Sequence, residues 1–411
     1  MNRTRQALTV ETPKDQEWVS HPQFEEELYR RNAHFPDVKP ITHGPQYHWF
    51  GYYDKFSTDP EDRFVLSMQV DFDDRSPKED DFIRVGLVDI EDSYKWTQLG
   101  KSRAWCWQQG CMLQWRPGST DEVMWNDRSR DRFVCHIVNV QTGDRRTLDF
   151  PVYHVRPDGK DALVADFSRI QSLRPGYGYP GIPDKSENIS SPEEIGISIA
   201  NLETGKLELL FSVKDIASIP YEDPAADDMH YFNHLAWNTD GSRFLFLHRW
   251  RSAGGRFPDF RTRMFTAAAN GSDVRLVTDK PYVSHFTWRD PEHIAIWREN
   301  SYKLYKDDGS GSEETILNAP NGHHTYLQGN QWMIADTYAD KDGCQNPFLF
   351  HVGTGRIVPL GHFQTLRYTT GELRCDLHPR IIRDGKRVII DSTHGGNGRQ
   401  QYLFDIADYI G

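Results

Sequence analysis

The stretch EVMWNDRSRDRFVCHIVNVQTGDRRTLDF (122–150) predicts three short strands joined by two polar turns. The strands are rich in β-branched and aromatic residues, and the turn VQTGD (140–144) supplies Gly and Asp. An apolar strand that ends in such a turn occurs seven times along the 411 residues. The other six turns are DIED (89–92), LETGK (202–206), AANGSD (268–273), KDDGSG (306–311), VGTGR (352–356) and DIAD (405–408). A repeat of this size cannot bury its own apolar face, so each must pack on its neighbours.

A further strand precedes each unit and completes a set of four. Examples are HLAWNTDG (234–241), HFTWRDPE (285–292) and HPRIIRDG (378–385). Four antiparallel strands in each of seven repeats predict an all-β fold, a seven-bladed β-propeller. The last repeat stops soon after its third strand, at QYLFDIADYIG (401–411). We therefore expect the N-terminal region to supply the missing outer strand and to close the ring.

The predicted domain organisation is simple. Residues 1–40 are polar and form an N-terminal extension, and residues 41–411 form a single propeller domain. Two separate β-sandwiches are the alternative, but they would not show the same turn seven times.

Composition limits the classes of partner. The net charge is −12, from 48 basic and 60 acidic residues, which disfavours general nucleic-acid binding. Five cysteines without a CxxC pair disfavour a disulfide framework or a zinc ribbon. Without a signal-peptide core or a run of about 18 apolar residues, we expect a cytoplasmic protein with no membrane partner. The sequence predicts no particular oligomeric state.

Histidines gather at the starts of the innermost strands in the later repeats. His234 and His378 each precede an Asp-Gly turn by six residues, so they should occupy equivalent places in their blades. His285, His323 and Asp376 begin other innermost strands. The starts of these strands meet on one face of a propeller, so the side chains should converge at one mouth of the central channel.

Other candidates lie in loops and in the first repeats. The first repeat offers His48, and repeat four has an Arg-rich loop, RWRSAGGRFPDFRTR (249–263), that ends at Arg263. Long loops on a rigid scaffold usually carry function. GGNGR (395–399) lacks the strand-to-helix setting of a phosphate loop, so no nucleotide cofactor is predicted. The side chains expected to contact a substrate are Arg174, Tyr177, Tyr179, His394, Arg399 and Gln109.

These residue types favour elimination across a uronic-acid glycoside. His and carboxylate groups can hold a divalent metal such as Mn, Ca or Zn, and Arg forks match a carboxylate. A cation on the uronate carboxylate stabilises the negative charge that develops when the C5 proton leaves, and Tyr, His or Arg can take that proton. We therefore expect a lyase whose partner is an acidic oligosaccharide.

Three alternatives stay open at this point. Each single His is compatible with a hydrogen-bonded structural role. A glycoside hydrolase normally needs two carboxylates across the bond, and Asp54 and Asp376 are the main acidic residues at the predicted strand starts. A propeller can also be a non-catalytic binding platform, because the fold does not determine the function.

The chain from about residue 230 onward resembles the oligogalacturonate lyases, cytoplasmic seven-bladed propellers that use a bound divalent metal. NHLAWNTDG, SHFTW and DLHPR…STHGG occur in the family's order. The resemblance implies Arg263 as the proton-abstracting base and His285 as a residue that assists beside the substrate. His234 is a further catalytic candidate, and His323 and His378 would be metal ligands.

The last blade departs from that family. The lyases present Gln-x-x-His-x-His-Pro, whereas this chain has Leu373, Asp376, His378 and Pro379 at the same places. One ligand is lost and one becomes the Asp376 carboxylate, which favours a harder metal such as calcium or manganese.

The first half resembles another branch of the same superfamily through HWFGYYDKF, MQVDFDDRSP and LRPGYGYPGIPD. That branch includes propeller enzymes that cut rhamnose–glucuronic acid linkages, as lyases or as α-L-rhamnosidases, and ulvan lyases share the fold. In the rhamnosidases the catalytic His lies in a segment similar to HWFGYYDK, which implies His48 here.

Overall fold

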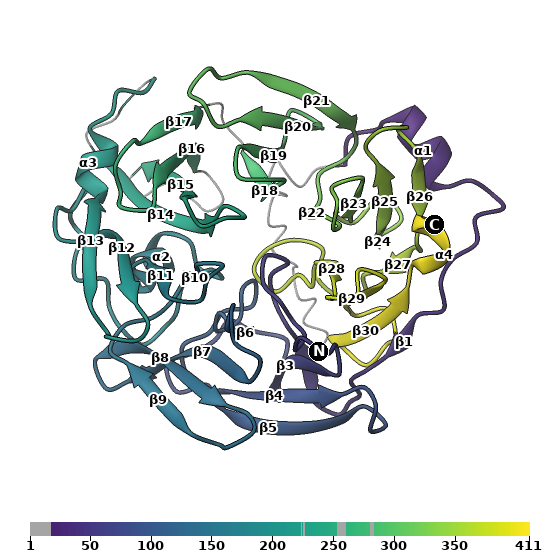
Figure 1. Cartoon of the computed structure of the whole chain (residues 1–411), viewed down its shortest axis with the longest axis horizontal. Helices are drawn as coiled ribbons and strands as arrows, with labels where there is room; N and C mark the ends of the chain where they lie inside the picture. The colour runs from purple at the N-terminus through teal and green to yellow at the C-terminus, as the bar shows by residue number, and fades with distance from the viewer. Residues whose placement is uncertain (1–17, 223, 225–226, 253–259, 280–282) are drawn as a thin grey trace, which may run out of the picture.

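The computed structural model describes residues 18–222, 224, 227–252, 260–279 and 283–411. In these residues seven four-stranded sheets stand around a central axis, which confirms the predicted seven-bladed β-propeller (Figure 1). Neighbouring strands within each blade are antiparallel, as predicted. In the first six blades the strands follow chain order within the sheet.

Blades one to three are built in the first half of the chain. Blade one contains β2 (Tyr47–Trp49), β3 (Phe64–Val70), β4 (Ile83–Asp89) and β5 (Lys95–Ser102). Blade two contains β6 (Gln114–Trp115), β7 (Glu122–Ser129), β8 (Arg132–Asn139) and β9 (Arg145–Leu148). Blade three contains β10 (His154–Val155), β11 (Asp161–Val164), β12 (Gly196–Asn201) and β13 (Leu207–Ser212).

Blades four to six follow. Blade four contains β14 (Asp228–Trp237), β15 (Arg243–Ser252), β16 (Arg261–Ala268) and β17 (Arg275–Thr278). Blade five contains β18 (Ser284–Trp288), β19 (His293–Arg298), β20 (Ser301–Lys306) and β21 (Glu313–Asn318). Blade six contains β22 (His324–Tyr326), β23 (Trp332–Ala335), β25 (Phe348–His351) and β26 (Ile357–Pro359). A separate small sheet pairs β24 (Cys344–Gln345) with β27 (Phe363–Gln364).

Blade seven combines the two ends of the described chain. Its strands are β28 (Arg380–Ile381), β29 (Arg387–Ser392), β30 (Gln400–Asp405) and the N-terminal β1 (Lys39–Pro40). Lys39 of β1 pairs with Leu403 of β30, so β1 is the outer strand of this sheet (Figure 1). The outer edge of β30 is therefore covered.

The burial of the strands in blade two shows why this sequence forms a propeller. Residues 133–138 of β8 are buried without alternation, because sheets on either side cover both faces of a middle strand. The outer strand β9 is largely exposed, which fits the polar letters in RRTL. A tight turn joins β7 to β8, and Arg130 in it has a left-handed φ of 55°.

Four short helices decorate the ring. They are α1 (Pro22–Leu28), α2 (Phe167–Leu173), α3 (Val213–Ala217) and α4 (Ala407–Ile410). Helix α1 packs on blade six, where the ring of Phe24 lies 5.0 Å from that of Phe348. None of the described helices has the length and apolar character that crossing a membrane requires.

The segment that follows β2 reaches from blade one to the axis. The ring of Tyr52 lies 5.3 Å from that of His234 in blade four, and the Tyr53 hydroxyl hydrogen-bonds to the main chain of Phe286 in blade five. Gly51 permits this path, because it has a φ of 104° and a Cβ there would lie 3.1 Å from the Gln109 backbone. The segment thus brings two tyrosines to the centre of the ring.

Candidate active site

Four histidines meet at the axis, each from a different blade. The ring centroids of His285 and His323 are 4.0 Å apart, and those of His323 and His378 are 4.1 Å apart. His234 joins them through Tyr52, whose ring lies 5.1 Å from that of His378. All four imidazoles are buried. The strand starts predicted to converge therefore do converge; we name these four residues the axial histidines.

The backbone at three of the axial histidines is unusual. His234, His285 and His378 have φ values of 53°, 38° and 44°, in the left-handed region. The strand register shifts around His234 and around His285, as at a β-bulge. Bulges re-aim side chains, and strained residues of this kind cluster at functional sites. The strain is repeated in three blades, which favours a shared purpose over an accident of one loop.

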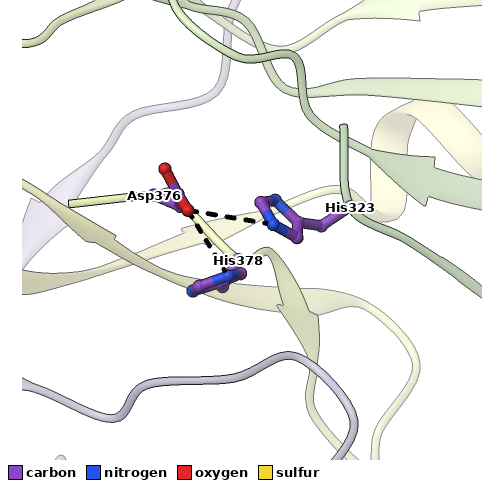
Figure 2. Close-up of side chains that lie close together, drawn as sticks. All are labelled: His323, Asp376 and His378. Carbon is purple, nitrogen blue, oxygen red and sulfur yellow. Dashed lines mark ion pairs between the residues drawn. The ribbon is translucent and has the colours of Figure 1, made fainter. Parts of the chain in front are cut away.

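His323, Asp376 and His378 form a candidate metal site. One carboxylate oxygen of Asp376 lies 3.9 Å from Nε2 of His323 and 3.9 Å from Nε2 of His378 (Figure 2). The three donor atoms lie within 4.8 Å of one another. Among the described residues, neither Nε2 atom has a hydrogen-bond partner although both are buried. An unpaired buried polar group costs about 1–3 kcal/mol, so two of them facing one carboxylate fit a divalent cation.

Asp336 holds two of these donors in place. Its carboxylate accepts hydrogen bonds from the main-chain N–H of His323 at 2.7 Å and of His378 at 3.1 Å. It also lies 3.0 Å from Nδ1 of His323. A proton on that Nδ1 leaves the lone pair of Nε2 free to face Asp376. Carboxylates orient metal-binding histidines in this way.

Arg374 links the candidate metal site to a phenol. Its Nε donates to Asp376 at 2.8 Å, and another of its N–H groups donates to the hydroxyl of Tyr177 at 3.1 Å. The guanidinium of Arg174 lies 4.5 Å from the centre of the Tyr177 ring. Burial alone would raise the pKa of Tyr177, but Arg374 and Arg174 outweigh that effect and lower it. Tyr177 is therefore the phenol best suited to accept a proton here.

His234 carries its ring proton on Nε2, whereas His323 carries its proton on Nδ1. Its main-chain N–H donates to the Tyr153 hydroxyl, which in turn donates to Oε1 of Gln109. That orients the Gln109 amide N–H toward Nδ1 of His234, at the long distance of 3.5 Å. A neutral His234 then carries its proton on Nε2. Burial, followed by Arg249 and Arg174, holds its pKa well below the usual value and keeps it neutral.

His285 is held by neutral groups. Its Nδ1 lies 2.9 Å from Oδ1 of Asn321, and its Nε2 lies 3.2 Å from the Tyr338 hydroxyl. Burial and the neighbouring His323 lower the pKa of His285 well below the usual value. It therefore presents a fixed neutral ring beside the candidate metal site.

Arg263 lies away from the axial histidines. Its guanidinium donates to the main-chain oxygens of Ile216 (3.1 Å), Ile219 (2.9 Å) and Pro220 (3.1 Å), where helix α3 ends. It also donates to Nδ1 of His248 at 3.1 Å. Burial lowers the pKa of Arg263 to about 10, yet its N–H groups are engaged in these bonds.

His48 also lies outside the axial group. Its two ring nitrogens contact Gln400 at 3.2 Å and Gln69 at 2.9 Å, and its ring faces Trp96 of the outer strand. These contacts of His48 with described residues involve no axial histidine. The segment HWFGYYDK thus sends Tyr52 and Tyr53, rather than His48, to the axis.

The predicted substrate-binding residues divide into two groups. Arg174, Tyr177 and Gln109 lie beside His234, as described above. Tyr179 is buried, stacks on Phe167 with ring centroids 4.1 Å apart and bonds to Asn126. His394 packs between two aromatic rings and bonds to Ser392 at 2.8 Å.

Arg399 contacts the backbone next to the candidate metal site. It donates to the main-chain oxygens of Leu373 and, at 2.9 Å, of Arg374, and its guanidinium lies 4.6 Å from the centre of the Trp107 ring. It fixes the segment that carries Asp376. The part of the Arg-rich loop that includes Arg256, residues 253–259, lies outside the described residues.

Sequence reasoning passed over several residues that the fold brings to the site. Asp336 and Tyr338 lie in ADTY (335–338), and Tyr52 lies in HWFGYYDKF, one of the segments that carried the family resemblance. Arg374 lies two residues before Asp376. Their roles depend on contacts between blades far apart in sequence. The one signal in the sequence was the motif HWFGYYDKF, which contains Tyr52.

Comparison with known proteins supports the fold. No protein-family model matches the chain, and neither does a curated protein. An oligogalacturonate lyase in complex with manganese is similar, with a TM-score of 0.65 and 13% identity over 91% of this chain and 94% of that one. An oligogalacturonate lyase from Vibrio parahaemolyticus gives 0.63 and 13% over the same shares. A prolyl endopeptidase gives 0.53 and 10% over 89% of this chain and 48% of its own. At these identities the similarity shows the propeller fold alone.

Proposed function

We propose that this protein is a carbohydrate lyase that cleaves a uronic-acid-containing oligosaccharide by β-elimination. The observation that carries the proposal is the pair of unpaired Nε2 atoms of His323 and His378 that face Asp376. The guanidiniums of Arg174 and Arg249 lie near His234, and they suit an anionic substrate in an otherwise acidic chain. The similarity to oligogalacturonate lyase structures is consistent with this assignment.

A divalent cation would be held by His323, Asp376 and His378. When bound, it would neutralise the uronate carboxylate and so make the C5 proton more acidic. The two imidazoles, one of them oriented by Asp336, and one carboxylate form a mixed nitrogen and oxygen donor set, which suits manganese better than calcium. Oligogalacturonate is one substrate class of this chemistry, and rhamnosyl-glucuronate is the other that the sequence resemblance suggests.

The protein's own side chains divide the remaining work. Arg174 and Arg249 orient the substrate by its negative charge. Tyr177, as phenolate between Arg374 and Arg174, takes the proton from C5. The Nε2–H of the neutral His234 donates a hydrogen bond to the leaving glycosidic oxygen, which takes its proton from water, because loss of the only ring proton would leave an imidazolate. The C5–H and C4–O bonds break and the C4=C5 double bond forms, so one proton is taken up and one is released.

Tyr177 takes the role that the family resemblance gave to Arg263. The reason is access: Arg263 is fully buried and donates its N–H groups to three carbonyl oxygens and to His248. His285 keeps its assisting position, because its ring contacts His323 and its nitrogens are fixed by Asn321 and Tyr338.

A hydrolase of the ordinary two-carboxylate type has less support. Asp376 is bonded to Arg374 and faces the axial histidines, whereas Asp54 is bonded to Lys55 and lines a cavity elsewhere in the channel. The two carboxylates therefore do not flank a common space. A hydrolase that uses His48 as its catalytic residue also has less support, because both ring nitrogens of His48 contact glutamines.

Product analysis tests the proposal. The protein is incubated with Mn²⁺ and with oligogalacturonate or a rhamnosyl-glucuronate oligosaccharide, and the products are followed by ultraviolet absorbance and mass spectrometry. We expect an unsaturated uronate, which absorbs in the ultraviolet and is lighter than the hydrolysis product by one water. Saturated products with free rhamnose would reject the lyase and favour the rhamnosidase.

A further inference from the structure

A second level of the central channel lies beyond the axial histidines. Three residues after His234, His285, His323 and His378 come Trp237, Trp288, Tyr326 and Ile381. An extended strand rises about 3.3 Å per residue, so the second level lies about 10 Å from the first along the axis. All four of these later residues line one cavity of about 580 Å³. Every blade contributes an innermost strand or its extension to that cavity.

Tyr53 separates the two levels. Its ring centroid lies 5.2 Å from that of His323 and 6.3 Å from that of His285, and the same residue lines the cavity. Its hydroxyl bonds to the main-chain oxygen of Phe286 at 3.1 Å and to the main-chain N–H at 3.2 Å. The two bonds fix the hydroxyl end of the ring, and no axial histidine is among the described residues that line the cavity, so the cavity is distinct from the axial histidines.

The walls of the cavity are mainly apolar and rich in aromatic rings. They include three indoles, of Trp115, Trp237 and Trp288, together with Tyr326 and Phe56. Phe56 is 50% exposed and stands at the rim. Ligand pockets typically hold about 300–1,000 Å³, with apolar and aromatic walls and a few polar groups that fix orientation. This cavity has the size and the walls of such a pocket.

Asp54, Lys55 and His154 lie close together in the cavity, and its charged groups are balanced. Asp54 and Lys55 form an ion pair with an N···O distance of 2.8 Å, and Nε2 of His154 lies 4.0 Å from Asp54. Arg380 is paired with the buried Asp391 at 2.7 Å. Asp54 and His154 are partly exposed and remain able to bond to hydroxyl groups. No net charge is left to attract an ionic ligand.

We propose that this cavity, called here the aromatic cavity, binds a neutral saccharide of one or two rings. The apolar face of a sugar ring packs on indole and phenyl rings, and its hydroxyls suit a carboxylate and an imidazole that lie close together. Uronates are disfavoured, because Asp54 would oppose their carboxylate. The site goes beyond the proposed lyase activity, which needs an acidic sugar at the axial histidines.

Ligand binding to the full-length protein tests the proposal. D-glucose, D-galactose and L-rhamnose are the probes, D-glucuronate is the charged comparison, and binding is measured by saturation-transfer NMR and calorimetry. Phe56→Ala removes an exposed wall, and Asp54→Asn removes the carboxylate. Phe35→Ala is the matched control, because Phe35 is 38% exposed and does not line the cavity. Asp376→Asn controls for binding at the axial histidines.

We expect saturable binding of at least one neutral sugar, weakened about three- to tenfold by Phe56→Ala and by Asp54→Asn. Phe35→Ala and Asp376→Asn should leave the affinity unchanged, and D-glucuronate should not compete in the Asp376→Asn protein. No saturable binding of any neutral probe would overturn the proposal. Binding that only Asp376→Asn weakens would also overturn it, and it would leave the proposed lyase intact.

Discussion

This propeller contains two clusters of histidine and arginine side chains. They are alike in residue type, but they differ in whether the histidine nitrogens have hydrogen-bond partners. In blade four, Arg263 donates to His248 at 3.1 Å, and His248 contacts His230 at 3.0 Å. Around the axis, His323 and His378 keep Nε2 atoms that no described residue bonds. The first cluster is a closed chain of hydrogen-bond donors and acceptors. In the second, two unpartnered imidazole nitrogens face one carboxylate.

The difference teaches that residue type alone does not identify a site. A buried histidine with both nitrogens bonded contributes to stability, because breaking its chain leaves a partner unpaired. A buried histidine with a free nitrogen costs stability and is retained for another purpose.

Matched substitutions should separate the two clusters. Asn tolerates the φ of 44° at position 378, so His378→Asn removes a metal ligand without straining the backbone. Turnover should therefore fall about a thousandfold. His248→Asn should leave turnover of the folded protein unchanged and lower the free energy of unfolding by about 1–3 kcal/mol. Uronate turnover and urea unfolding measure the two effects. The reverse pattern, with stability lost at His378 and turnover lost at His248, would refute the distinction.

Tyr177→Phe removes only the hydroxyl between Arg374 and Arg174. If that phenol takes the C5 proton, kcat should fall about 10²–10⁴-fold while the metal affinity stays the same. Tyr221→Phe, at the phenol that contacts His230 in the closed cluster, is the matched control and should not change kcat. A kcat within a few fold of wild type in Tyr177→Phe would remove Tyr177 from the mechanism.

Asp336→Asn should weaken the candidate metal site without touching its donors. The amide cannot orient His323 as the carboxylate does, so the affinity for Mn²⁺ should fall about 10–100-fold. Asp127→Asn breaks a comparable pair, His136 with Asp127 at 3.1 Å, and should have no effect on that affinity. Calorimetric titration of the chelator-treated protein compares the two. Equal affinities would mean that Asp336 has a purely structural role.

The free energy of unfolding should depend on pH through His48. Burial lowers the pKa of His48 from its usual value of 6.5 to about 4. Between these values the unfolded state binds a proton that the folded state does not, so stability is complete above pH 6.5 and is lost as the pH falls toward 4. His48→Gln should flatten this dependence by about 1–3 kcal/mol in urea unfolding. Identical pH profiles in both proteins would contradict the buried, structural role.

The fold was accessible from the sequence because its signal is repeated and local. The turn VQTGD and its six counterparts each mark the end of a third strand, and the structure has a strand ending near each of them. Convergence of His234, His285, His323 and His378 followed from the same symmetry.

The rest of the site depends on contacts that no periodicity describes. Tyr52 reaches the axis along a loop from blade one, and Asp336 bonds to the main chain of two blades. Arg263 was assigned to the site by resemblance, but its guanidinium is held by the carbonyl oxygens at the end of helix α3. Side-chain direction and loop path, which set these contacts, are properties of the folded chain.

A metal titration of the chelator-treated protein tests the central claim most directly. Mn²⁺ is added stepwise in the presence of uronate oligosaccharide, while the absorbance of the unsaturated product is recorded for wild type and for His378→Asn. We expect wild-type turnover to be absent at first and to saturate at one Mn²⁺ per chain, and we expect the variant to stay inactive. Turnover that survives complete metal removal, or that His378→Asn retains, would contradict it.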